Sequence, residues 1–328
     1  MNYELCTFNL MLYKILFLPA RLLIYFYCRK IVINNKNMLY EKGPLLIAAN
    51  HPNSFLDAII LATLFKNPVY SLTRGDAFKG KKITKILTSL NMLPVYRLSE
   101  GAEKLDNNYF TFDECQNIFR QGGIVLIFSE GRCINEWHLR PLKKGTARLA
   151  LAAWKENIPL KIIPLGINYS SFRTFGKNVF LNFGNIINKE NIYVDFTGGK
   201  AVNEFNEKLQ QQLQGLVLEV DKNDVEKLRK YFYIRKPFLE KILLFVPAAA
   251  GYIFHFPLYF LIDVSIKNKA SDHYDSIMIA ILFFLYPLYL LILTLIVFFI
   301  TQNSISLLLL LFIPLTALGL LHFKRQIK

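Results

Sequence analysis

The sequence lacks the cysteine patterns that mark zinc sites and disulfide-rich secreted domains. Its 328 residues include only Cys6, Cys28, Cys115 and Cys133, which are scattered and form no C-x-x-C pair. Zinc sites built from cysteine ligands and thiol redox motifs need closely spaced cysteines. We therefore expect free thiols in a reducing compartment. Nothing else in the sequence requires a metal centre or a bound cofactor.

The sequence also has no convincing signal peptide and no recognised nucleic-acid motif. Its first apolar stretch is interrupted by Lys14 and Arg21 and has no small-residue cleavage site. The chain carries 39 Lys and Arg against 24 Asp and Glu, and 53% of its residues are hydrophobic. This combination favours a phospholipid surface or phosphate-bearing substrates over nucleic acid as the anionic partner.

Charge is missing from one long segment near the end of the chain. No Asp, Glu, Lys or Arg occurs between Asp275 and Lys324. Within this segment, residues 277–300 and 306–323 are each long enough to cross a bilayer. Residues 238–262 are also apolar but are interrupted by two prolines and a histidine. We expect a transmembrane hairpin, with 238–262 re-entrant or interfacial rather than spanning.

Basic residues flank this hairpin at both ends and are absent from its turn. They are Lys267, Lys269, Lys324, Arg325 and Lys328. The positive-inside rule then places both ends of the hairpin in the cytoplasm. The rest of the protein stays on that side if residues 238–262 do not cross.

The N-terminal residues 8–28 have the pattern of an apolar helix with a basic stripe. Lys14 and Arg21 are seven positions apart, so they share one face, and Arg29 extends the stripe. This pattern is typical of a helix lying on an anionic leaflet. A helix of the soluble core is the alternative. The chain thus divides into a membrane-associated segment 1–33, a middle domain 34–235 and a membrane region 236–328.

The middle domain alternates short β-rich runs with helical stretches, which predicts an α/β fold with a largely buried sheet. The expected strands are 45–50, 68–74, 92–97, 123–128, 161–169 and 179–184. The expected helices are 56–66, 77–90, 102–121 and 143–157, followed by polar helix over 203–232.

A polar patch follows the first of these strands, in A-N-H-P-N-S-F-L-D (residues 49–57). His51 stands at the carboxyl end of the strand, where open α/β sheets place their sites. Asp57 can fold back onto one imidazole nitrogen, which leaves the other free to accept a proton from a hydroxyl. No serine or cysteine occupies a nucleophile elbow, so this hydroxyl belongs to the substrate. A histidine that only caps a helix is the alternative.

Three further blocks stand at the ends of later strands. They are L-P-V-Y-R ending at Arg97, F-S-E-G-R-C at 128–133 and I-I-P-L-G-I at 162–167. Together with the first block, this ordered set resembles the glycerolipid acyltransferase superfamily, which includes glycerol-3-phosphate and 1-acyl-glycerol-3-phosphate acyltransferases. The resemblance covers residues 40–190 and implies a mixed sheet flanked by helices. Four blocks in order are a far more specific signal than one.

Two features depart from the common pattern of that superfamily. Five residues separate His51 from Asp57, where four are usual. This longer spacing resembles the branch with fungal glycerol-3-phosphate/dihydroxyacetone-phosphate acyltransferases. In the third block Ser129 replaces a proline, and Arg132 follows Gly131 directly, so the family arginine has no strict counterpart.

The resemblance implies direct acyl transfer from acyl-CoA or acyl-carrier protein, with His51 as general base and Asp57 orienting it. It places Asn53, Arg97 and the Glu130–Gly131–Arg132 run at the glycerol-phosphate acceptor. Arginine binds phosphate in a bidentate manner and glycine admits a close approach of the backbone. Lysophosphatidate and glycerol 3-phosphate are both candidate acceptors, and a lipid without phosphate is a lesser one.

Other readings of the sequence stay open. A transacylase or lipase-like hydrolase would use the same histidine with another phospholipid or with water. A lipid-binding protein without catalysis would not need His51 at all. A basic run at Lys143, Lys144 and Arg148 reads as a solvated or lipid-facing surface, or as a phosphate site.

Overall fold

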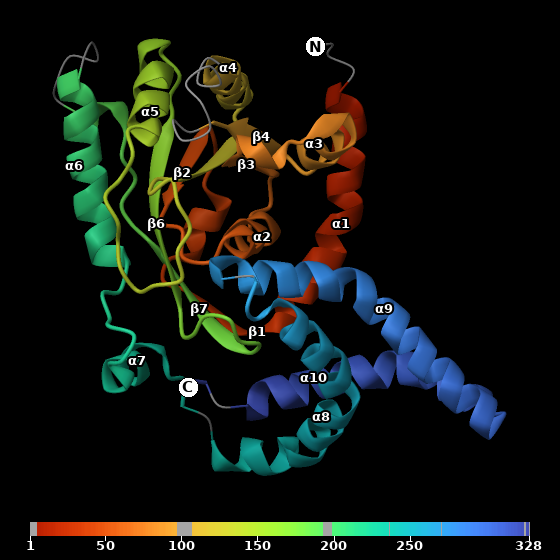
Figure 1. Ribbon diagram of the computed structural model, residues 1–328. Coiled ribbons are helices and arrows are strands. Elements are labelled where there is room, and N and C mark those ends of the chain that lie inside the picture. The colour runs from red at the N-terminus through yellow and green to blue at the C-terminus, as the bar shows by residue number, and fades with distance from the viewer. Residues whose placement is uncertain are drawn as a thin grey trace.

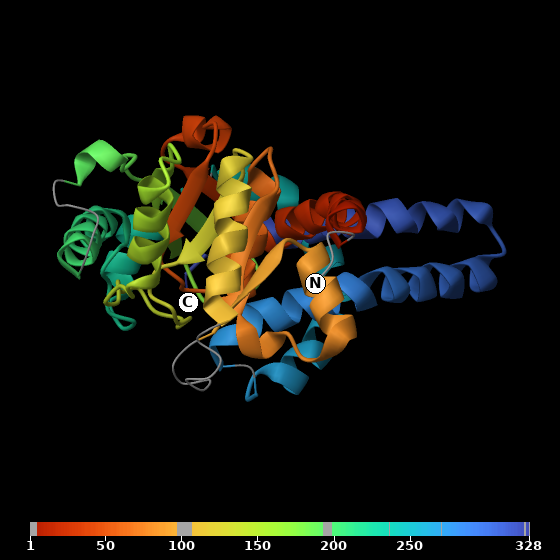
Figure 2. The same cartoon turned by 90° about the horizontal axis from the view of Figure 1, so that it is seen from above.

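The computed structural model describes residues 5–96, 107–192, 199–235, 237–269, 271–324 and 326–327. A seven-stranded sheet with helices on both faces forms its body, and long C-terminal helices extend from one side (Figures 1 and 2). The predicted α/β class, with a mixed sheet flanked by helices, is confirmed.

The strands lie in the order β1-β7-β6-β2-β5-β3-β4. All neighbours are parallel except β6 and β7, which are antiparallel. The strands are β1 Cys28–Ile33, β2 Leu45–Ala49, β3 Val69–Arg74, β4 Met92–Val95, β5 Ile124–Phe128, β6 Lys161–Tyr169 and β7 Lys177–Phe183. The central strand β2 is fully buried, so its carboxyl end opens in the middle of the domain.

Side chains of β2 alternate between two hydrophobic cores, as a strand covered on both faces requires. Leu45 and Ile47 pack in the core that includes α1 (Leu5–Tyr27), α2 (Phe55–Leu64) and the start of α9 (Tyr274–Thr301). Leu46 and Ala48 pack in the core formed with α4 (Asn107–Arg120), α5 (Gly145–Lys155) and α6 (Gly199–Leu216). The helices α3 Gly80–Ser89 and α7 Val225–Phe232 complete this part of the chain.

The N-terminal segment contributes more than a membrane-associated helix. Helix α1 ends at Tyr27, and the next residues form β1, a strand of the sheet that the sequence did not predict. Lys14 and Arg21 are exposed on α1, as expected for a basic stripe. The prediction that Arg29 extends this stripe is wrong, because Arg29 lies in β1 and is buried. Its guanidinium donates to backbone carbonyls at the C-terminal end of α10 (Leu309–Phe323).

The C-terminal region forms α8 Phe238–Ile266, α9 Tyr274–Thr301 and α10 Leu309–Phe323. Three stretches are long and apolar enough to be candidate membrane spans, namely Ile242–Ile266, Tyr274–Thr301 and Ser304–Phe323. Residues 238–262, which we expected to be re-entrant or interfacial because of their prolines, lie within one continuous helix, α8. Its C-terminal half is anchored to the domain, because Leu258, Ile262 and Ile266 are buried in the core that also contains β2.

Candidate active site

His51 and Asp57 are brought together by the short loop that connects β2 to α2. We call residues 51–57 the catalytic loop. The Nδ1 atom of His51 lies 2.9 Å from Oδ2 of Asp57, and the Asp57 side chain is fully buried whereas that of His51 is 16% exposed. Asp57 stands in the first turn of α2, where the helix dipole favours a negative charge. The imidazole therefore has one nitrogen bound to a carboxylate and its Nε2 left for proton exchange.

Two further donors fix the Asp57 carboxylate. The backbone N–H of Asn53 donates to Oδ2 at 2.8 Å, and the Tyr169 hydroxyl donates to Oδ1 at 2.6 Å. Burial, together with the charge of Asp57, raises the pKa of Tyr169 well above its usual range, so the phenol keeps its proton and acts as a donor. Sequence reasoning missed Tyr169, although it ends β6, the strand beside β2.

The His51 ring is also held by packing. It stacks on the ring of Phe128 with a centroid separation of 3.8 Å and an interplanar angle of 13°. Phe128 ends β5, which pairs with β2 in parallel, so both rings emerge at the same edge of the sheet. Asp57 therefore holds the imidazole by a hydrogen bond in the plane of the ring, and Phe128 holds it by packing against the face of the ring.

Glu130 braces the backbone around His51. Its Oε2 accepts the backbone N–H of His51 at 2.8 Å, and its Oε1 accepts that of Arg140 at 2.9 Å. The side chain is buried, and this burial raises the pKa of Glu130, although the two N–H donors act in the opposite direction. Both carboxylate oxygens are engaged by backbone, so the geometry indicates a positioning residue. The direct acceptor contact expected for Glu130 stays a prediction.

Replacing Glu130 with glutamine tests this bracing role. The amide offers one acceptor oxygen in place of two, so one buried N–H, of His51 or of Arg140, loses its partner at a cost of about 1–3 kcal/mol. We expect kcat to fall by about tenfold or more with little change in substrate KM. Steady-state kinetics on the purified variant measure this, and a Glu130→Gln protein with unchanged kcat contradicts the assignment.

The other predicted substrate-binding residues lie in different places. Gly131 has a left-handed backbone, with φ at 65°, and it lines the cavity described below together with the exposed Arg132. Asn53 is fully buried and does not line this cavity; its side chain donates to Asp275 instead. We therefore assign Asn53 to the support of the catalytic loop rather than to substrate binding. Arg97 lies outside the described residues.

A cavity of about 2310 Å³ opens at His51. Basic side chains line it from the ends of β3 and β5 and from the start of α5, namely Arg74, Arg132, Lys143 and Arg148. Apolar side chains line it from α9, namely Ile277, Ala280, Ile281, Phe284 and Leu285. The cavity therefore joins groups suited to a phosphate with groups suited to a hydrocarbon chain.

The segment that leads into α9 also borders the site. Residues 272–276, which we call the α9 entry segment, contribute Asp272, His273 and Ser276 to the cavity wall. His273 Nδ1 lies 2.7 Å from the Ser54 hydroxyl of the catalytic loop. No local sequence pattern marks these residues, so sequence reasoning did not include them in the site.

Among the described residues, no group of three or more His, Cys, Asp or Glu side chains could hold a metal ion. The described cysteines Cys28, Cys115 and Cys133 are free thiols. Cys133 lies beside the catalytic loop and accepts the backbone N–H of Ser54. Burial and the nearby Asp57 raise the pKa of the Cys133 thiol, so it is not a thiolate nucleophile at neutral pH.

Comparisons with known proteins show what this chain is similar to. Residues 30–168 match the model of the family described as Acyltransferase. An uncharacterised acyltransferase of the fission yeast Schizosaccharomyces pombe is 25% identical over 181 residues, which is 53% of this chain. The chain spans about a quarter of the length of that relative. The 1-acyl-sn-glycerophosphate (LPA) acyltransferase PlsC from Thermotoga maritima matches with a TM-score of 0.45 and 13% identity, over 63% of this chain and 79% of that one.

The part of the chain that carries His51, Asp57 and Glu130 is thus an acyltransferase domain. The match spans all four sequence blocks and confirms their resemblance to an acyltransferase family.

Proposed function

We propose that this protein is a membrane-bound O-acyltransferase that moves a fatty acyl group from acyl-CoA or acyl-carrier protein to a glycerol-phosphate acceptor. Lysophosphatidate and glycerol 3-phosphate are the two acceptors that fit. The proposal rests on one observation above all: the His51–Asp57 pair opens into a single cavity with both basic and apolar walls. Such a cavity suits a reaction that joins a phosphate-bearing alcohol to a fatty acyl chain.

The reaction follows from the geometry of the pair. The acceptor hydroxyl gives its proton to Nε2 of His51 as its oxygen attacks the thioester carbonyl carbon. Asp57 stabilises the imidazolium that forms. The C–S bond then breaks, and His51 returns the proton to the departing thiolate. The products are an ester and a free thiol, and no acyl-enzyme is formed.

The basic residues of the cavity support a phosphate-bearing acceptor. Arg132 and Lys143 stand near Gly131, and Arg148 follows in the first turn of α5. An arginine can hold a phosphate through two parallel hydrogen bonds, and a lysine supplies a point charge. We assign Lys143 and Arg148 to phosphate binding together with Arg132, which keeps the substrate-binding role expected from the sequence. Arg97 also stays a predicted substrate-binding residue.

The acyl chain has an apolar place to lie. A second cavity of about 250 Å³, lined almost wholly by apolar side chains of α1, α2, β3, β4 and α9, adjoins the large one. The two cavities share Phe55, Ala58, Ala280 and Phe284 in their walls. A hydrocarbon chain attached to a thioester near His51 can extend past these residues and leave water.

Replacing Ala280 with phenylalanine tests this route. The larger side chain fills the shared wall, so long acyl chains lose space whereas short ones do not. We expect the kcat/KM ratio of long-chain to medium-chain acyl donors to fall by about tenfold or more. Leu311→Phe, which adds the same ring at an exposed apolar position of α10, is the matched control. An unchanged ratio in Ala280→Phe argues against this acyl route.

The placement of the candidate membrane helices is also part of the proposal. The start of α9 is bonded to the catalytic loop, and the last residues of α10 are bonded to Arg29 of β1. Figure 2 shows that α9 and α10 both extend away from the sheet and are joined at their far end. We therefore take them as a membrane hairpin with both ends on the side of the catalytic domain. The flanking basic residues favour the cytoplasm as that side if α8 does not cross the membrane.

An acceptor panel tests the proposed function. Purified protein in detergent or lipid receives acyl-CoA or acyl-carrier protein with glycerol 3-phosphate, lysophosphatidate, or a lysolipid without a phosphomonoester. Mass spectrometry then identifies the ester formed. We expect one phosphate-bearing acceptor to be preferred. Transfer to the third acceptor alone contradicts the phosphate assignment, and release of free fatty acid favours a hydrolase.

A further inference from the structure

The α9 entry segment is hydrogen-bonded to the catalytic loop. Oδ2 of Asp275 accepts the side-chain N–H of Asn53 at 2.9 Å, and the Ser276 hydroxyl accepts the backbone N–H of Leu56 at 3.1 Å. Asp275 lies 222 positions after Asn53 in the chain. The segment that the Acyltransferase family model matches ends at residue 168, so these contacts come from outside it.

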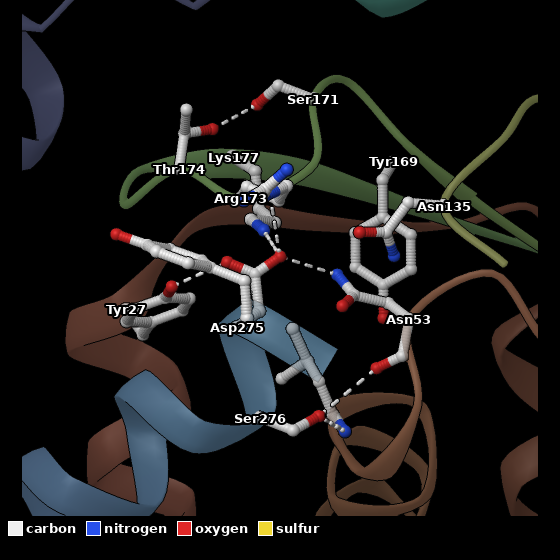
Figure 3. A network of polar contacts seen from close by, with 12 residues as sticks. Tyr27, Asn53, Asn135, Tyr169, Ser171, Arg173, Thr174, Lys177, Asp275 and Ser276 are labelled. Carbon is white, nitrogen blue, oxygen red and sulfur yellow. Dashed lines mark hydrogen bonds and ion pairs between the residues drawn. The ribbon is translucent and has the colours of Figure 1, made fainter. Parts of the chain in front are cut away.

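Asp275 is the centre of a buried polar network (Figure 3). Its carboxylate forms an ion pair with Lys177, and it accepts the Tyr27 hydroxyl at 2.6 Å and the backbone N–H of Arg173 at 3.0 Å. The side chains of Asp275 and Lys177 have no exposed surface. With Asn53, the carboxylate has donors from α1, the catalytic loop, β7 and the turn before β7.

Asn53 links this network directly to the catalytic pair. Its side chain donates to Asp275, while its backbone N–H donates to the same Oδ2 atom of Asp57 that contacts His51. The peptide that carries the N–H therefore has its place set from one side by Asp275. If Asn53 shifts, Asp57 loses the donor at Oδ2 and keeps the Tyr169 hydroxyl at Oδ1, so its carboxylate is held less firmly against the imidazole.

We propose that Asp275 is a positioning residue for acyl transfer, which acts through Asn53 on the His51–Asp57 pair. On this proposal, which rests on the proposed function, the first turn of α9 is part of the catalytic apparatus and not only a membrane anchor. A geometric shift of about 1 Å at a reacting group can lower the rate by about 100-fold. The proposed effect depends on the oxygen of residue 275 that accepts the side-chain N–H of Asn53.

Two double variants separate this role from a purely structural one. Lys177→Met with Asp275→Asn, and Lys177→Met with Asp275→Leu, both remove the buried charges and keep a side chain of similar size. Only the first keeps an oxygen at position 275 that can accept from Asn53. We expect the Asn variant to retain kcat within severalfold of the wild type. We expect kcat of the Leu variant to fall by about 10- to 100-fold with KM for both substrates nearly unchanged.

Amide hydrogen exchange of the catalytic loop gives a second readout that does not need activity. We expect residues 51–57 to exchange faster in the Leu variant than in the Asn variant, with the rest of the sheet unchanged. Equal kcat and equal exchange in the two variants would overturn the proposal. An inactive wild type counts against the proposed function, but the exchange comparison still decides the role of Asp275.

Asn53→Ala provides an independent check if either double variant fails to fold. It removes the linking side chain and leaves the ion pair of Asp275 with Lys177 intact, together with the Tyr27 bond. We expect the same fall in kcat at unchanged KM, and faster exchange confined to the catalytic loop. An Asn53→Ala protein with wild-type kcat and wild-type exchange contradicts the link.

Discussion

Replacing His51 with alanine is expected to lower kcat for acyl transfer by about 10²- to 10⁴-fold, the range that a general acid–base contributes. His51 lines the cavity, and its Nδ1 is held by Asp57. The loss is expected in kcat, because the basic and apolar walls that bind substrate remain in place.

The matched control for this variant is His138→Ala. His138 is exposed, bonds to Glu219 and does not line the cavity, so its loss removes an imidazole without touching the site. We expect this variant to keep wild-type kcat. Steady-state kinetics of the three proteins, with thermal unfolding to confirm that each is folded, measure the difference. A His51→Ala protein as active as His138→Ala would remove His51 from the mechanism.

The second large effect concerns stability. Asp275→Leu alone leaves the ammonium group of Lys177 buried without its counter-ion. Removing one partner of a buried ion pair typically lowers the free energy of unfolding by about 3–5 kcal/mol. Adding Lys177→Met removes that unpaired charge, and similar exchanges of a whole pair for apolar residues are often neutral. We therefore expect the single variant to be far less stable than the double variant.

Thermal unfolding in detergent at fixed pH and protein concentration compares these proteins. The wild type and the Lys177→Met/Asp275→Leu variant are expected to unfold at similar temperatures, and Asp275→Leu well below both. If the single and double variants unfold at the same temperature, the charge of Lys177 is not the source of the instability. Because the double variant is expected to fold, its kcat reports on positioning and not on unfolding.

Much of this structure could be predicted from the sequence. Each expected strand of the middle domain was found, because buried β runs are short, apolar and bounded by turn residues. The His51–Asp57 contact followed from a strand that ends two residues before the histidine and a helix that starts two residues before the aspartate. Both features are local, and local patterns are what a single sequence reveals.

Other features depend on contacts between distant parts of the chain. Tyr169 lies 112 positions after Asp57, and nothing in its own strand shows that its hydroxyl is bound to a carboxylate. Strand β1 was missed because Arg29 and Lys30 look like surface residues, although Arg29 is buried where α10 supplies carbonyl acceptors. Asn53 was expected at the substrate because it stands next to His51, but tertiary packing turns its side chain towards Asp275.

One measurement tests the central claim most directly: the rate of thiol release from an acyl thioester, with and without a glycerol-phosphate acceptor, in the wild type and in His51→Ala. We expect release by the wild type to require the acceptor and to equal the ester formed, and we expect the variant to release almost none. Thiol release that does not depend on the acceptor, or that continues in His51→Ala, contradicts acyl transfer by the His51–Asp57 pair.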